Sequence, residues 1–254
     1  MAPQGILVKV IQVNAWLGHL MYPLFELLEQ EDPDVVCLQE ILSNEKRNPL
    51  FESFSIQQRL SEKFAYHYFS PTYKFPAFGE QVGMGNLILS KHPLSNQRTH
   101  FVSGKFEESQ TISNYVLNIR NAQLCTVDIA GSTFTMVNHH GFHDLDPAGT
   151  AESLACMQKL IDELKQVRGP IIMCGDFNVQ PDSAAIQAIH SQLPLKNLTT
   201  EYGLETTLSP IFRVKDIQVS ADYIFVSPEI HVSNFQASDR IVSDHKALIL
   251  ECTL

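Results

Sequence analysis

The chain has 254 residues, of which 44% are hydrophobic and 18% are charged, as in ordinary globular proteins. Its 18 Lys and Arg against 28 Asp and Glu give a formal net charge of −10, which argues against a protein that coats nucleic acid through many phosphate contacts. No apolar run reaches the roughly 18 residues of a membrane span and no signal-peptide pattern opens the sequence, so we expect one cytoplasmic, monomeric domain over residues 1–254.

Short apolar runs alternate with amphipathic ones along the chain, which favours an α/β protein. The helix at 147–167 has Leu154, Met157, Ile161 and Leu164 on one face. The five cysteines include no CxxC pair and are expected to be reduced thiols of the core. The predicted elements are strands at 6–13, 35–38, 86–89, 171–174, 223–226 and 247–250, a hairpin at 115–129 and 133–138, and helices at 21–30 and 147–167.

Polar side chains stand at the ends of these apolar runs, where a sheet presents side chains to a common cleft. A single carboxylate in such a place is unremarkable, but a series of acids, amides and imidazoles indicates a site. The series consists of Asn14, Glu40, His140, Asp176, Asn178, Asp222, Asp244 and His245.

Each polar cluster has a structural and a chemical interpretation. Glu40 and Asn14 are either surface caps or oxygen ligands suited to Mg²⁺. Asp176 and Asn178 either form an Asx turn or project the same way from an extended segment, to orient a water and stabilise a phosphoryl oxygen. His245 is either a structural histidine or a base or phosphate partner.

Two competing enzyme classes are disfavoured by their missing motifs. His140 and His143 form an HxxH pair, but it follows a strand and lacks the helical HExxH context of a zinc protease. A phosphate-contacting His140 is favoured, with His139 facing the opposite side of its strand. No GxSxG motif is present, so a serine hydrolase is not supported.

The motifs, taken together and in order, resemble the endonuclease/exonuclease/phosphatase superfamily. They are Asn14, Leu-Gln-Glu at 38–40, Gly-Asp-Phe-Asn at 175–178, Asp-Tyr-Ile-Phe at 222–225 and Ser-Asp-His at 243–245. The resemblance runs from residue 6 to residue 253. It implies a four-layer α/β sandwich, in which two mixed β-sheets pack face to face with helices outside, and Mg²⁺- or Mn²⁺-dependent cleavage of a phosphoester.

The resemblance also assigns roles to individual residues. It implies that Glu40 is the principal metal ligand, supported by Asn14 and Asp244. It also implies that Glu80, in Gly-Glu-Gln-Val, pairs with His140.

The remaining roles concern the reacting phosphate. By the same resemblance, Asp176 and Asn178 orient the water and stabilise the transition state. His245 lies at the scissile phosphate and is held by Asp222, and His140 is the second histidine of the site.

Two departures weaken an apurinic-endonuclease role. Ile41-Leu42 follows Leu-Gln-Glu where those enzymes usually have Thr-Lys, and His140 stands where they often have a tyrosine. The segment after His140 is acidic, which disfavours tight binding of long duplex DNA.

We therefore expect a Mg²⁺- or Mn²⁺-dependent phosphodiesterase or phosphatase acting on a small phosphoester, a lipid head group or a short nucleic acid. A DNA-acting nuclease and a non-catalytic binding member of the same fold are the alternatives. Whether Asp176 or His245 is the general base stays open from the sequence.

Overall fold

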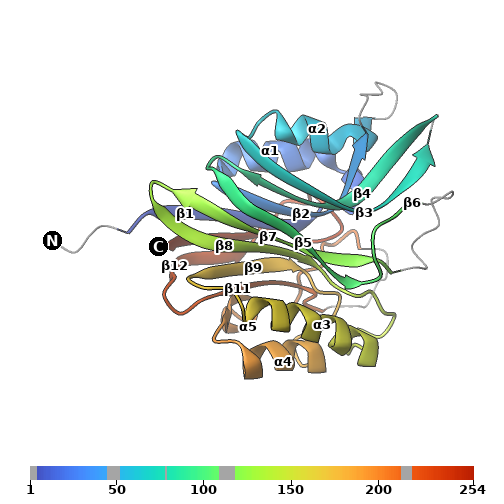
Figure 1. The fold of residues 1–254 in the computed structure, drawn as a ribbon. Coiled ribbons are helices and arrows are strands. Elements are labelled where there is room, and N and C mark those ends of the chain that lie inside the picture. Colours follow the sequence, from blue (N-terminus) through green and yellow to red (C-terminus); the bar gives the residue numbers. More distant parts are fainter. Residues whose placement is uncertain (1–4, 45–51, 78, 109–117, 213–218) are drawn as a thin grey trace.

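The structure is a computed structural model, which describes residues 5–44, 52–77, 79–108, 118–212 and 219–254. Two mixed sheets pack face to face, with helices on both outer faces (Figure 1). This arrangement confirms the predicted four-layer α/β sandwich. Among the described residues, no helix is long and apolar enough to span a membrane.

The seven-stranded sheet has the order β12-β13-β1-β2-β4-β3-β6, and the six-stranded sheet has the order β10-β11-β9-β8-β7-β5. The pairs β1–β2, β3–β6 and β8–β9 are parallel and the other pairs are antiparallel. The strands are β1 (Leu7–Asn14), β2 (Val35–Asn44), β3 (Tyr66–Ala77), β4 (Glu80–Ser90), β5 (Leu94–Ser103), β6 (Glu107–Glu108), β7 (Arg120–Ile129), β8 (Ser132–His140), β9 (Ile171–Asp176), β10 (Lys196–Asn197), β11 (Asp222–Val226), β12 (His231–Ala237) and β13 (Leu248–Thr253).

Helices cover the two outer faces, and three apolar clusters join the four layers. One cluster joins α1 and α2 to the seven-stranded sheet, one fills the space between the sheets, and one joins the six-stranded sheet to α3 and α4. All five cysteines are buried and free, and four of them lie between the sheets. The helices are η1 (Trp16–Gly18), α1 (Met21–Glu31), η2 (Glu52–Ser55), α2 (Ile56–Ser61), α3 (Ala151–Leu164), α4 (Ala184–Gln192) and α5 (Leu198–Glu201).

One predicted helix begins later than expected for a local reason, and the predicted hairpin closes with a tight turn. The helix expected from residue 147 begins at Ala151, because Thr150 caps it: Ser153 N–H donates to the Thr150 hydroxyl and Thr150 N–H donates to the Ser153 hydroxyl. The Ala130-Gly131 turn joins β7 and β8 with both residues at positive φ, as a tight hairpin requires. The predicted start of that hairpin at Tyr115 lies outside the described residues.

Candidate functional site

Polar residues from the ends of β1 and β9, from β2 and from the segment before β13 line one cleft of about 430 Å³. The strand predicted to end before Glu40 continues to Asn44, so Glu40 lies within β2 and not at its end. Strand register explains part of this arrangement: in the six-stranded sheet Asp176 stands opposite both His140 and Asp222. The structure brings together every predicted site residue except Glu80. They are Asn14, Glu40, His140, Asp176, Asn178, Asp222, Asp244 and His245.

A β-bulge aims Glu40 at the cleft. Two residues of β2, Gln39 and Glu40, oppose the single Asn86 of β4, and Glu40 adopts a φ of +54°. Bulges of this kind redirect a side chain and are common beside active sites. The Glu40 side chain keeps 18% of its surface exposed, so it can reach a ligand in the cleft.

Asp222 holds His245 by a buried ion pair. The Nδ1–H of His245 donates to Asp222 Oδ2 over 2.8 Å, and the Thr207 hydroxyl donates to the same oxygen over 2.7 Å. Gln12 Nε2 donates to the other carboxylate oxygen over 3.0 Å. Burial opposes the charged imidazole, but attraction to Asp222 and Asp176 outweighs it and raises the pKa of His245 to about 10.

Asp176 lies at the centre of the polar cluster. Asn14 Nδ2 donates to its Oδ2 over 3.0 Å, and the backbone N–H of Asn178 donates to its Oδ1 over 2.9 Å. The Nε2 atoms of His140 and His245 stand 3.8 and 3.9 Å from Oδ2. Burial raises the pKa of Asp176 against the opposing effect of His245, and the carboxylate is therefore more basic than usual.

The segment Gly-Asp-Phe-Asn forms a turn, and the predicted extended projection of its two polar residues is wrong. Asn178 adopts a φ of +56°, and its N–H bond to Asp176 closes an Asx turn. This turn does not compete with function, because both side chains still line the cleft. Glycine is required at 175, since a Cβ there would lie 1.8 Å from the carbonyl oxygen of His139.

The two adjacent histidines of β8 face opposite sides, as strand alternation predicts. His139 packs its ring edge-on against Phe177, with the centroids 5.0 Å apart. His140 faces the cleft, where its Nε2 stands 4.0 Å from Glu40 Oε1. Burial and the positive charge of Arg120 hold the pKa of His140 well below its usual value, so this imidazole is neutral.

The three residues predicted to hold the metal differ in how far their oxygens are already engaged. Asn14 Oδ1 accepts from the backbone N–H of Trp16 over 3.0 Å, which leaves one lone pair. Asp244 Oδ1 accepts from the Ser243 hydroxyl over 3.1 Å. Burial raises the pKa of Asp244, an effect that the nearby His245 opposes and the charge of Glu40 reinforces.

A cation fits these outer carboxylates better than it fits the inner group. Asp176, Asp222 and His245 offer ligand atoms within 4.8 Å of one another and could hold a metal ion. However, both inner carboxylates already accept hydrogen bonds on each oxygen, and His245 is itself positive. Glu40 and Asp244 both line the cleft and offer carboxylate oxygens, the ligands that Mg²⁺ and Mn²⁺ prefer.

Glu80 does not reach His140, contrary to the sequence expectation. It is the first residue of β4 and stands at the tip of the β3–β4 hairpin, opposite Ala77. Gly85 is the β4 residue next to the Glu40 bulge, so five residues of strand separate Glu80 from the site, about 16 Å at ~3.3 Å per residue. The hairpin extends further than the short strand predicted at 86–89.

Sequence reasoning missed an amide network that joins the sheets behind the site. Gln39 Nε2 donates to Asn138 Oδ1 over 2.6 Å, and Gln12 Nε2 donates to Gln39 Oε1 over 3.0 Å. The sequence did indicate these residues, because each is an amide side chain inside an apolar run, and a buried amide must find a hydrogen-bond partner. Thr207, which bonds Asp222, comes from a loop, where no periodicity could single it out.

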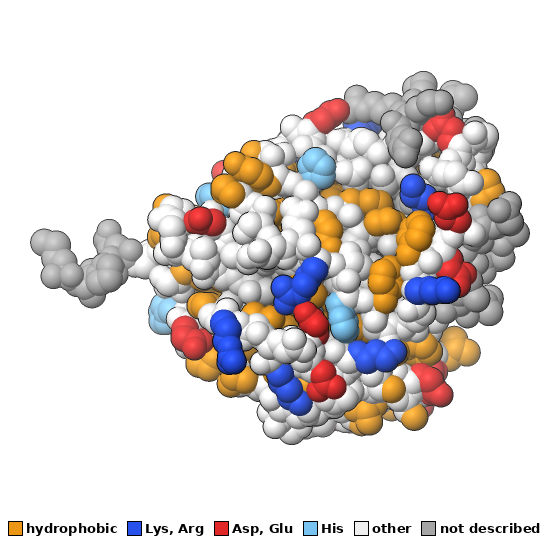
Figure 2. Space-filling model, viewed as in Figure 1, with side chains coloured by type: hydrophobic (Ala, Val, Ile, Leu, Met, Phe, Trp, Pro, Cys, Tyr) orange, Lys and Arg blue, Asp and Glu red, His pale blue; other side chains and the backbone are white. Residues whose placement is uncertain are grey.

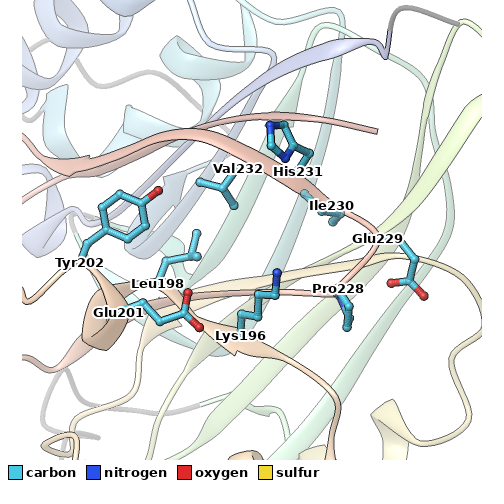
Figure 3. Close-up of a pocket in the computed structure, with 9 residues that line it drawn as sticks. All are labelled: Lys196, Leu198, Glu201, Tyr202, Pro228, Glu229, Ile230, His231 and Val232. Atoms are coloured by element: carbon cyan, nitrogen blue, oxygen red, sulfur yellow. The ribbon is translucent and has the colours of Figure 1, made fainter. Parts of the chain in front are cut away.

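A second hollow of about 220 Å³ lies between α5 and the start of β12 (Figure 3). Lys196, Glu201, Glu229 and His231 contribute charged or titratable groups of mixed sign. His231 pairs with Thr253, at the opposite end of β13 from His245. None of the predicted site residues lines this hollow, which therefore supplies matched controls for the cleft.

Comparison with known families finds one match over most of the chain. The model of the Endonuclease/Exonuclease/phosphatase family matches residues 11–245. No curated protein matches the sequence with significant similarity.

Solved structures share the fold at low identity. A Beutenbergia cavernae endonuclease/exonuclease/phosphatase superposes with a TM-score of 0.71 at 20% identity, covering 98% of this chain and 72% of that one. The mannosyl-6-phosphatase Bt3783 of Bacteroides thetaiotaomicron gives 0.68 at 18%, covering 97% and 100%. The human Nocturnin catalytic domain with bound sulfate gives 0.66 at 18%, covering 98% and 96%.

Proposed function

We propose that this chain, which belongs to the endonuclease/exonuclease/phosphatase family, hydrolyses a phosphoester with the help of a divalent metal ion. The observation that carries the proposal is the meeting, in one cleft, of two carboxylates, Glu40 and Asp244, and an imidazole held by a buried carboxylate. The first group suits a cation and the second suits a phosphoryl oxygen, so a phosphate placed between them meets positive charge on both sides.

Glu40 and Asp244 would hold Mg²⁺ or Mn²⁺, with Asn14 beside them. When bound, the metal supplies positive charge that polarises a phosphoryl oxygen and eases departure of the leaving oxygen. Asn14 has a further role that needs no metal: it ties Asp176 to the Trp16 turn through its amide.

Asp176 would orient and deprotonate the attacking water. The water oxygen forms a bond to phosphorus, its proton passes to the Asp176 carboxylate, and the bond from phosphorus to the leaving oxygen breaks. His245 Nε2–H would donate to a phosphoryl oxygen, because Nδ1 is committed to Asp222. Neutral His140 and the Asn178 amide would complete the set of hydrogen-bonding groups around the phosphate.

A small phosphoester, a short single strand or a lipid head group is the proposed substrate class. Among the described residues that line the cleft, none is Lys or Arg. On the face shown in Figure 2, basic side chains are interspersed with acidic ones and do not form a continuous stripe. The basic pairs Lys46-Arg47 and Arg213 with Lys215 lie outside the described residues.

A substrate screen tests the proposal directly. DNA, RNA, phospholipid and sugar or inositol phosphates are each incubated with the protein in Mg²⁺, Mn²⁺ or excess EDTA. We expect turnover of one class with metal, loss in EDTA and recovery on adding metal back. Full activity in EDTA contradicts the metal mechanism, and inactivity on every class without Mg²⁺ or Mn²⁺ binding by calorimetry favours a non-catalytic binding protein.

A further inference from the structure

The cleft lining includes apolar side chains that the hydrolysis of a phosphate does not require. Next to the polar cluster lie the side chains of Trp16, Leu17, Leu145, Pro147 and Phe212. A site for phosphate alone would need only polar groups and a cation, so these side chains face another part of the ligand.

One apolar wall is fixed to the catalytic groups by the backbone. Trp16 and Leu17 are both half-buried and adopt φ values of +47° and +54°, a conformation that non-glycine residues rarely take. The Trp16 N–H donates to Asn14 Oδ1, and Asn14 in turn bonds Asp176. The wall is therefore held at a constant position relative to the proposed attacking water.

A second aromatic side chain of the cleft lining touches the histidine of the site. Phe212 packs edge-on against the His245 ring, with the centroids 5.9 Å apart. At the mouth of the cleft, Leu145 leaves 93% of its surface exposed to water. An exposed leucine beside a binding cleft contributes to affinity when an apolar ligand covers it.

The charges of the cleft limit what else the ligand carries. Glu40, Asp144, Asp176 and Asp244 are among its lining residues, whereas no Lys or Arg is present among the described ones. One bound cation and His245 can accept one phosphate, but a second phosphate would lie against carboxylates. Charge therefore favours an uncharged group beside the single phosphate.

We propose that the substrate carries an apolar ring, aromatic or otherwise planar, attached to a single phosphate and seated against the Trp16-Leu17 turn and Phe212, which line the same cleft. This inference rests on the proposed function, since it names the substrate class of the same site. Two aromatic side chains in one cleft, Trp16 and Phe212, suit a flat group, which gains dispersion contacts and edge or face contacts with their rings.

The single tryptophan of the chain makes the proposal measurable without turnover. Trp16 emission is titrated with phenylphosphonate, methylphosphonate and octylphosphonate in Mg²⁺, all of which resist hydrolysis. We expect phenylphosphonate to bind at least about tenfold more tightly than methylphosphonate, from the apolar area that a ring buries. Equal affinities would overturn the proposal, and tightest binding of octylphosphonate would replace the ring by a flexible chain.

Variants test whether the preference for phenylphosphonate arises in the cleft. Phe212→Ala and Leu145→Ala should narrow the preference for phenylphosphonate, and the high exposure of Leu145 makes the second change safe for folding. Tyr202→Ala, an exposed aromatic of the other hollow, is the matched control and should leave the preference unchanged. An equal loss in the control would place binding elsewhere and overturn the proposal.

The two proposals fail separately. If the protein hydrolyses phosphoesters yet binds phenylphosphonate and methylphosphonate equally, the proposed function stands and the proposed ring site is wrong. If the protein prefers phenylphosphonate but hydrolyses none of the screened esters, the proposed function is wrong and the proposed ring site stands.

Discussion

The polar cluster has an inner and an outer part, and the two are built differently. In the inner part, each carboxylate oxygen of Asp176 and Asp222 accepts a hydrogen bond of 3.0 Å or less. In the outer part, Asp244 has its Ser243 contact at 3.1 Å, and Glu40 has His140 Nε2 at 4.0 Å. The inner part is complete within the protein, whereas the outer part gains most from a ligand.

This difference suits the two parts of the cluster to different roles in the proposed reaction. Groups locked by hydrogen bonds cost no reorganisation when charge develops on the substrate, so the inner part is suited to the transition state. Partly buried carboxylates without a cationic partner are costly until a cation neutralises them, so the outer part is suited to metal binding. Mutations in the two parts should therefore affect different kinetic constants.

The largest effect is expected when the inner part is broken. His245→Ala should lower kcat by about 10²–10⁴-fold with a parallel fall in kcat/KM, because the imidazole acts in the transition state. Steady-state kinetics on the substrate found by the screen measures this. The control His231→Ala removes an exposed histidine from the other hollow and should leave kcat unchanged. Unchanged turnover with a lowered Tm in His245→Ala would make this residue purely structural.

Breaking the outer part should give a smaller and reversible loss. Glu40→Gln keeps the size of the side chain but removes its charge, so the affinity for Mg²⁺ should fall by at least about tenfold. Calorimetry measures that affinity directly, and raised Mg²⁺ should restore part of the activity. Asp176→Asn is the matched inner variant, and Mg²⁺ should not rescue it. Wild-type Mg²⁺ affinity in Glu40→Gln would remove this residue from the metal site.

Much of this site followed from one pattern, an apolar run that ends in a polar residue. The pattern located Asn14, Asp176 and Asp222. Asp176 and Asp222 stand opposite each other at the ends of neighbouring strands, and Asn14, at the end of β1 in the other sheet, bonds Asp176. The family resemblance, not this pattern, assigned Glu80 to the site, and it failed there because the length of a strand and the extent of a hairpin depend on pairing partners that a local sequence does not specify.

Other features were beyond sequence reasoning for a different physical reason. The bulge at Glu40 depends on the register of β2 against β4, and the contacts of Thr207 and Phe212 depend on how loops close over the strand ends. None of these has a period that a sequence pattern could reveal. Gln39 could have been recognised, since a buried amide in an apolar strand must find a partner.

A pH experiment sharpens the description of the inner part. Because the folded pKa of His245 is raised from 6.5 to about 10, its contribution to stability is complete below pH 6.5 and is lost as pH rises through 10. The Tm of metal-free wild type should therefore fall more steeply between pH 7 and 10 than that of His245→Gln. Burial also raises the pKa values of thiols such as Cys125 and Cys252, but these are common to both proteins and cancel in the difference. Parallel curves would contradict a charged His245.

The smallest effect is expected from salt, and it tests how many phosphates the outer surface contacts. The slope of log affinity against log salt is about −0.9 per neutralised phosphate on duplex DNA, so a cleft that binds one or two phosphates should give a magnitude below about 2. The measurement is kcat/KM against salt on duplex DNA and on a small diester, with the diester as the control for effects on chemistry. The basis is the acidic balance of 18 Lys and Arg against 28 Asp and Glu, together with a described cleft lining that holds four acids and no Lys or Arg.

Efficient duplex cleavage with a slope of magnitude about 4 or more would mean at least four or five neutralised phosphates. A steep slope would require a cationic surface beyond the cleft. It would favour the interpretation of this protein as a DNA-acting nuclease over its interpretation as a hydrolase of small phosphoesters.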